Sequence, residues 1–189
     1  MEARHGQVSS PPSRAQLYLA AWQAAGLEAG KFFPASDSGL RDPYAPDDTM
    51  NGQPPEDGRI ASAGHDFAAL LDEPRNDWKT QSVSSGQRLD IAWYSGTAHR
   101  TRRWNYFLTK EGWDPGERLS RGQFEAEPFH AEQLTCQPFW SCDSLIPEEP
   151  TTHTLLMPRR ADGYQVLLAV WEIADTPNAF YQVIDLEYT

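Results

Sequence analysis

From residue 164 to residue 172 the chain reads Tyr164-Gln165-Val166-Leu167-Leu168-Ala169-Val170-Trp171-Glu172, a nearly continuous apolar run. A short run of this kind is typical of a strand that is buried on both faces, as in the core of a β-sandwich. The segment Ala161-Asp162-Gly163 directly before it has the residues that favour a turn. We therefore expect a strand from Tyr164 to Glu172 that packs in the centre of the fold.

Further strands are indicated on both sides of this run. From about Gln87 apolar and more polar residues alternate, and Phe180 to Tyr188 alternates again. Trp104 to Thr109 is rich in aromatic residues, and Asp114-Pro115-Gly116 provides another turn signal. Several short strands separated by turns favour a mostly all-β fold, a β-sandwich.

The first third of the chain differs in character. Leu17 to Gly30 has apolar residues at helical spacing, and Gly30 is a natural stop, so we expect a helix there. Phe32 to Arg59 contains five prolines and predicts a long irregular loop that serves function, although its aromatic residues would equally pin it to the core. We expect residues 1–189 to form one domain, with residues 17–59 as a helix-and-loop insertion.

Composition limits the possible partners. The net charge of −11 argues against nucleic acid or an anionic membrane as a partner. It suits an uncharged or cationic substrate, or it serves only to keep the protein soluble. No apolar run approaches the roughly 18 residues that span a bilayer. Cys136 and Cys142 are the only cysteines, and a disulfide between them would imply an oxidising compartment, whereas free thiols would suit the cytosol.

Histidines are the candidate metal ligands, but their spacing alone is uninformative. None of the five matches a recognised metal motif, and each would more often be structural or solvated; they are His5, His65, His99, His130 and His153. A histidine that becomes the first residue of a mature chain offers its α-amine and its imidazole to one ion. With a second histidine it completes a planar three-nitrogen site, which suits copper. Met1 to Arg4 precede His5, so this site requires their removal.

Several segments, in order along nearly the whole chain, carry a family resemblance. They are His5-Gly6, Ser10-Pro11-Pro12-Ser13-Arg14, Asp57-Gly58-Arg59-Ile60-Ala61-Ser62-Ala63, His99 to Lys110, Gly112-Trp113-Asp114, Pro128-Phe129 and, most strongly, Val166 to Asp185. Together they resemble the bacterial chitin-binding proteins that are lytic polysaccharide monooxygenases, auxiliary activity family 10, formerly carbohydrate-binding module family 33. The resemblance implies a fibronectin-III or immunoglobulin-like β-sandwich with a helical, loop-rich insertion after the first strand.

The resemblance also implies a catalytic site. One copper ion is held by His5, through its α-amine and imidazole, and by the imidazole of His99, with Phe180 in an axial position beside the ion. The implied activity is oxidative cleavage of crystalline chitin, or of cellulose, with an external electron donor. A secreted protein, a monomer with no nucleic-acid or membrane partner, is expected.

A flat exposed face is implied for binding the substrate. Phe32 aligns with a surface aromatic that the family uses for chitin, Ser38 falls where the family has an acidic residue, and Thr97 replaces a small alanine near the second histidine. These last two departures concern substrate preference more than the copper site. Two other functions stay open: a non-catalytic chitin-binding module, and a domain for adhesion to surface glycans.

Overall fold

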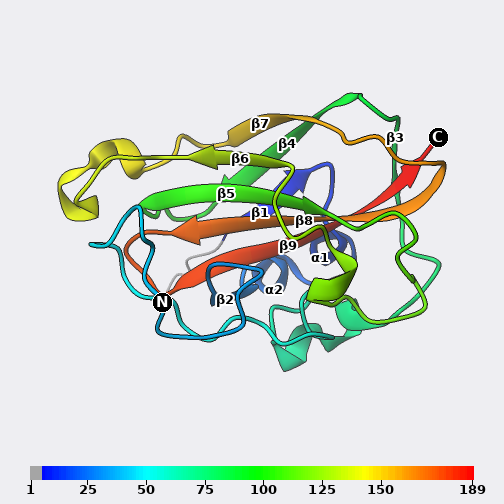
Figure 1. Ribbon diagram of the computed structural model, residues 1–189, viewed down its shortest axis with the longest axis horizontal. Helices are drawn as coiled ribbons and strands as arrows, with labels where there is room; N and C mark the ends of the chain where they lie inside the picture. The colour runs from blue at the N-terminus through cyan, green and yellow to red at the C-terminus, as the bar shows by residue number, and fades with distance from the viewer. Residues whose placement is uncertain (1–5) are drawn as a thin grey trace.

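The computed structural model describes residues 6–189, which form two facing β-sheets with helices and loops on one side (Figure 1). The strands are β1 Gly6–Ser10, β2 Glu28–Gly30, β3 Gln81–Val83, β4 Arg88–Ser95, β5 Thr101–Leu108, β6 His130–Gln133, β7 Thr151–Leu156, β8 Gly163–Ile173 and β9 Asn178–Tyr188. The short helices are α1 Arg14–Tyr18 and α2 Ala21–Ala24, with 3₁₀ turns η1 Asp66–Asp72, η2 Arg121–Gln123, η3 Phe139–Ser141 and η4 Asp143–Leu145. Within residues 6–189, none of the helices has the length and apolar character needed to cross a bilayer.

The two sheets have different sizes. The smaller one has the order β1-β4-β7, and the larger one has the order β2-β9-β8-β5-β6, with β3 also pairing with β9. All these pairings are antiparallel except that of β3 with β9. The expected β-sandwich is therefore confirmed, and so are the strands predicted near Gln87, Trp104, Tyr164 and Phe180.

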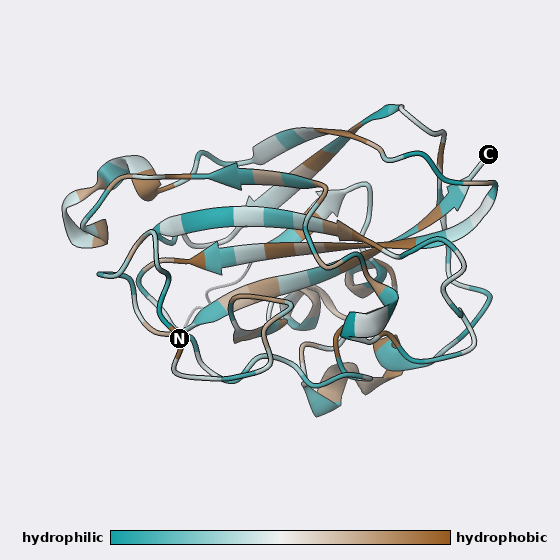
Figure 2. Cartoon of the chain, viewed as in Figure 1, coloured by the Kyte–Doolittle hydropathy of each residue, from teal (hydrophilic) through white to brown (hydrophobic). Residues whose placement is uncertain are grey.

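The continuous apolar character of β8 follows from layers on both of its faces. Leu167 and Trp171 point into the core between the two sheets. Val166 and Leu168 point to the opposite face, where they pack with residues of α1, α2 and the loop that follows β2. Figure 2 shows this central strand as a largely brown, apolar band between more hydrophilic loops. Alternation is lost because neither face of β8 meets water.

The helix predicted from Leu17 to Gly30 is wrong in extent. Helix α1 ends at Tyr18, and Ala20 has extended backbone angles before α2 begins. The side chain of Gln23 accepts a hydrogen bond from the backbone N–H of Ala20 and so starts a new helix. Residues Glu28–Gly30 are a strand because they pair with β9, so tertiary pairing overrides the helical pattern. The irregular loop from Phe32 to Arg59 is as predicted.

Candidate functional site

A row of three aromatic side chains crosses the larger sheet at one end of the sandwich. Trp171 on β8 lies directly opposite Trp104 on β5 and Phe180 on β9 in the strand register. The Trp171 ring is stacked on both neighbours, with centroids 6.2 Å from Trp104 and 5.1 Å from Phe180. All three are buried in the core between the sheets, so the row is a rigid floor.

His99 lies at the edge of this floor, in the turn between β4 and β5. Its ring centroid is 5.9 Å from that of Phe180 and 6.0 Å from that of Trp171. Its backbone is fixed as well, because Thr101 Oγ1 donates to the His99 carbonyl at 3.1 Å and accepts from Trp171 Nε1 at 2.7 Å. The structure thus brings together two of the predicted catalytic residues, His99 and Phe180, through Trp171.

Gly6 lies against the same indole. A Cβ atom at this position would be 2.1 Å from Cζ3 of Trp171, so only glycine allows this approach of backbone to ring. The Gly6 amide donates to the Ala25 carbonyl at 3.1 Å, which fixes the direction of the chain. The predicted copper ligand His5 precedes Gly6 and lies outside the described residues.

Phe32, the predicted polysaccharide contact, occupies an unusual backbone conformation. Its φ angle is +77°, a value rare for bulky side chains. The buried carboxylate of Glu172 accepts a hydrogen bond from the Phe32 amide at 3.1 Å. The ammonium group of Lys31 lies 5.6 Å from the centroid of the half-buried Phe32 ring and donates to the Ile173 carbonyl at 2.7 Å. The end of β8 therefore sets the conformation of this segment.

Buried charges connect the Phe32 segment to the sheet. Glu172 forms an ion pair with Arg103 at 3.4 Å, and Arg103 also contacts the buried carboxylate of Asp42. Burial raises the pKa of Glu172, while the Arg103 charge opposes this rise. Burial also lowers the pKa of Lys31 to about 8, although the carboxylates of Asp48 and Glu172 oppose this. A loop fixed by such buried ion pairs is a preorganised surface.

The other two predicted substrate contacts lie on separate segments. Ser38 is exposed in the loop that follows Phe32, and Thr97 is half-buried two residues before His99. The Phe32–Ser38 segment and the β4–β5 turn are thus the two chain segments that present the predicted contacts.

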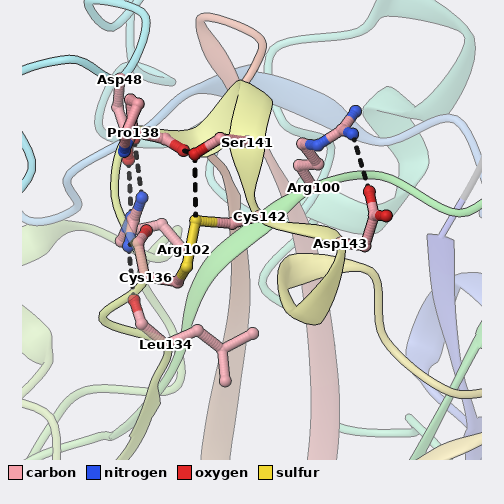
Figure 3. The surroundings of a disulfide bond; sticks show 9 residues. All are labelled: Asp48, Arg100, Arg102, Leu134, Cys136, Pro138, Ser141, Cys142 and Asp143. Carbon is pink, nitrogen blue, oxygen red and sulfur yellow. Dashed lines mark hydrogen bonds and ion pairs between the residues drawn. A yellow bond between two sulfur atoms is a disulfide. The ribbon is translucent and has the colours of Figure 1, made fainter.

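Of the two states that the sequence leaves open for Cys136 and Cys142, the structure has the disulfide, with Cα atoms 6.0 Å apart (Figure 3). Beside it, the guanidinium group of Arg102 is only 2% exposed and binds both carboxylate oxygens of Asp48, at 2.7 and 2.8 Å. The same group donates to the carbonyls of Leu134 and Cys136. One buried arginine therefore ties the loop at residue 48 to the disulfide loop.

Sequence reasoning missed the organising role of Trp171 and the Arg102–Asp48 pair. A tryptophan inside a continuous apolar run is indistinguishable from any other core residue. Asp48 and Arg102 each lie in a polar, charged stretch of sequence, which gives no sign that these two charges meet. The one usable signal was Gly6 beside His5, since a glycine can mark a close backbone approach.

The candidate metal ligand among the described residues is His99, while His5 lies outside them. In the described range, 6–189, no three His, Cys, Asp or Glu side chains gather closely enough to hold a metal ion. Two described imidazoles lie beside the aromatic row: His99 next to Phe180 and Trp171, and His153 next to Trp104 with ring centroids 4.7 Å apart. An imidazole nitrogen suits copper, whereas calcium and magnesium prefer oxygen ligands.

These features define a fibronectin-like β-sandwich with a histidine and aromatic site at one end of its sheets. The chain belongs to the lytic polysaccharide monooxygenase family, since the model of the family described as "Lytic polysaccharide mono-oxygenase, cellulose-degrading" matches residues 5–186. The family resemblance and the fold expected from the sequence are both confirmed.

Individual proteins agree with this assignment. GlcNAc-binding protein A of Shewanella oneidensis is 32% identical over 195 residues, and the match covers 98% of this chain but 36% of that relative's length. A chitin binding domain from Burkholderia pseudomallei has a similar structure, with a TM-score of 0.94 at 50% identity over 98% of this chain and 100% of the other. Bacillus amyloliquefaciens CBM33 in complex with Cu(I) has a TM-score of 0.73 at 29% identity over 98% and 100% of the two chains.

Proposed function

We propose that the protein is a copper-dependent monooxygenase that cleaves chitin oxidatively, with His5 and His99 as the copper ligands. One observation carries the proposal: the backbone of Gly6 and the ring of His99 lie against the same buried indole, Trp171. Strand β1 therefore begins beside the same indole that the ring of His99 contacts. The family assignment and the similar copper-bound CBM33 structure support copper as the metal.

The chemistry of the donors explains the choice of ligands. His99 contributes one imidazole, and His5 contributes a second imidazole and its α-amine once it is the first residue. With Arg4 attached, that amine is an amide nitrogen and a much poorer ligand, so the proposal requires a chain that begins at His5. Bound copper supplies one-electron chemistry toward oxygen or peroxide.

The other residues of the site position these groups and restrict access. Thr101 and Trp171 hold the backbone of His99, so its ring is preorganised. The Phe180 ring, tilted by 41° to the His99 ring, closes one side of the site to water.

Chitin is the proposed substrate because two similar proteins are named for it or its sugar unit, GlcNAc. Phe32 is proposed to stack on a sugar ring, while Ser38 and Thr97 make polar contacts at the same face. The family description leaves cellulose as the alternative outcome of the test. We also propose that the protein is a secreted monomer that receives electrons from an external donor. The disulfide suits an oxidising compartment.

Electron paramagnetic resonance of copper-loaded protein, trimmed to begin at His5, tests the proposal. We expect an axial Cu(II) signal, and oxidised oligosaccharides from chitin with ascorbate. His99→Ala should abolish both and leave chitin binding within about twofold of wild type. His130→Ala, which removes a histidine outside the site, is the matched control and should change neither.

The outcomes separate the possible functions. Chitin binding without a copper signal or oxidised products would show a binding module. Absence of binding to α-chitin, β-chitin and cellulose would favour adhesion to other glycans.

A further inference from the structure

Two loops meet at the end of the sandwich that holds His99. They are residues 32–51 and residues 134–146, and both lie at the left of Figure 1, near the start of β5 and the end of β8. Ala174 joins them: its amide donates to the Arg100 carbonyl at 2.7 Å, and its carbonyl accepts from the Thr49 amide at 3.0 Å. Ala174 also packs with Cys142 of the disulfide loop. Both loops are therefore anchored next to the residue that follows His99.

Each loop exposes one large aromatic side chain. Tyr44 is 77% exposed and Trp140 is 60% exposed. The two positions are linked, because Gln137 Nε2, three residues before Trp140, donates to the Tyr44 carbonyl at 2.6 Å. Two exposed rings on linked loops near His99 are candidates for a contact surface.

The two loops that carry Tyr44 and Trp140 are held rigidly by buried contacts. Arg102 binds Asp48 of one loop and the Leu134 and Cys136 carbonyls of the other, and the disulfide closes the second loop, as Figure 3 shows. Arg100 adds an ion pair with Asp143 at 3.2 Å. The Trp140 ring itself packs edge-on against Phe139, with centroids 5.0 Å apart. Little conformational freedom of the backbone is therefore lost when these rings bind a partner.

The chemistry around the rings favours an uncharged, hydroxyl-rich partner. Asp47 and Asp143 are exposed on the same loops, and the whole chain carries a net charge of −11, so anionic polymers are repelled. Exposed carboxylates accept hydrogen bonds from hydroxyl groups, and aromatic faces stack on the apolar faces of sugar rings. Phe32 and Tyr44 also belong to one loop, so the proposed polysaccharide face and the exposed rings share a chain segment.

The geometry points to a second polysaccharide contact, formed by Tyr44 and Trp140, that binds β-linked glycan chains to the side of the copper site. This inference rests on the proposed function and extends its substrate surface from one loop to two. Because both contacts are on one rigid body, the second acts at a high effective concentration once the first is made. Tyr44 and Trp140 thus raise affinity for an extended crystal face, where both contacts are met at once.

Binding isotherms of the full chain on β-chitin test this contact. Tyr44→Ala and Trp140→Ala should each weaken binding about three- to tenfold, the loss expected for one aromatic stacking contact. Trp22→Ala is the matched control, because Trp22 on α2 is 62% exposed and packs against Phe67. It should bind as wild type does. Thermal unfolding of each variant shows that the fold is intact.

The outcomes distinguish this inference from the proposed function. If Phe32→Ala weakens binding while Tyr44→Ala and Trp140→Ala do not, the second contact is refuted and the first stands. If Trp140→Ala changes only the sedimentation coefficient of the protein, the surface contacts another copy of the chain and the inference is wrong. If wild type does not bind chitin or cellulose, both proposals fail.

Discussion

Glu172 Oε1 accepts a hydrogen bond from the backbone amide of Phe32 at 3.1 Å, and this contact joins the end of the central strand β8 to the proposed substrate face. Phe32 has a positive φ angle, and a bulky side chain persists in that region only where its surroundings enforce it. Glu172 is 1% exposed and is neighboured by the charges of Lys31 and Arg103. The buried carboxylate is therefore what fixes the aromatic contact.

Glu172→Ala should lower both stability and substrate binding. It removes one of the two carboxylates that pair with Arg103 and one of those near Lys31, and because Asp42 and Asp48 remain we expect a loss of about 3 kcal/mol in unfolding free energy. It also releases the Phe32 amide, so chitin affinity should fall even where the protein remains folded. Urea unfolding and chitin binding isotherms measure the two effects.

Glu172→Gln is the matched control, because it keeps an acceptor oxygen for the Phe32 amide and removes only the charge. We expect it to retain most of the chitin affinity while it loses part of the stability. Equal losses of affinity in the two variants would contradict a positioning role for the Glu172–Phe32 hydrogen bond.

The sequence predicts the strands well and the short helices poorly, for a physical reason. The apolar run at β8 and the alternation at β4 are local patterns that burial dictates directly. The break after Tyr18 depends on a side-chain cap and on pairing with a strand about 150 residues away, which no local pattern records. The prediction of one domain stays untested.

The candidate site likewise contains residues that the sequence could predict and contacts that it could not. His99 and Phe180 were predicted from a family resemblance, and the structure places their rings side by side. The pair Arg102 and Asp48 is separated by 54 residues in sequence, and each alone reads as an ordinary surface charge. Contacts between loops are set by the whole fold, so sequence patterns cannot reveal them.

Gly6→Ala should disturb the copper site from the side of the chain's first strand. The added Cβ would lie 2.1 Å from the Trp171 ring, so either β1 or the indole must move. We expect a loss of about 1–3 kcal/mol in unfolding free energy, as for overpacking of a core, and weaker Cu(II) binding to the chain that begins at His5. Calorimetric unfolding and copper titration measure these changes.

Gly96→Ala provides the control for this substitution. Gly96 lies in the β4–β5 turn near His99, but no atom lies within 4 Å of a Cβ added there. Its stability and copper affinity should match those of wild type. If the two variants behaved alike, the close packing of Gly6 on Trp171 would not be what positions the site.

His153 should make stability depend on pH below neutrality. Its Nδ1 accepts from the Tyr106 hydroxyl at 2.6 Å, and that hydroxyl accepts from Trp93 Nε1 at 3.0 Å. Burial lowers the pKa of His153 from 6.5 to about 4. Between these values the unfolded chain binds a proton that the folded chain does not, so stability falls as the pH drops from 6.5 to 4.

Solvent screens part of this effect, because His153 is only partly buried, and we expect a contribution of about 1–2 kcal/mol. His153→Gln keeps an acceptor for Tyr106 but does not titrate. Chemical unfolding of both proteins at several pH values gives the unfolding free energy as a function of pH. The difference between the two slopes is the contribution of His153. Parallel slopes would show that His153 is protonated equally in both states.

Removal of the disulfide should weaken the proposed second glycan contact. The bond between Cys136 and Cys142 closes a loop with a sequence separation of 6, so the double variant Cys136→Ser, Cys142→Ser should lose about 2 kcal/mol of unfolding free energy. The loop that presents Trp140 then keeps Arg102 as its main anchor. We expect chitin affinity to fall as far as it does in Trp140→Ala.

Dithiothreitol should lower the affinity of wild type in the same way and leave that of the double variant unchanged. A double variant that is less stable but binds chitin like wild type would show that Arg102 alone suffices to hold the contact in place.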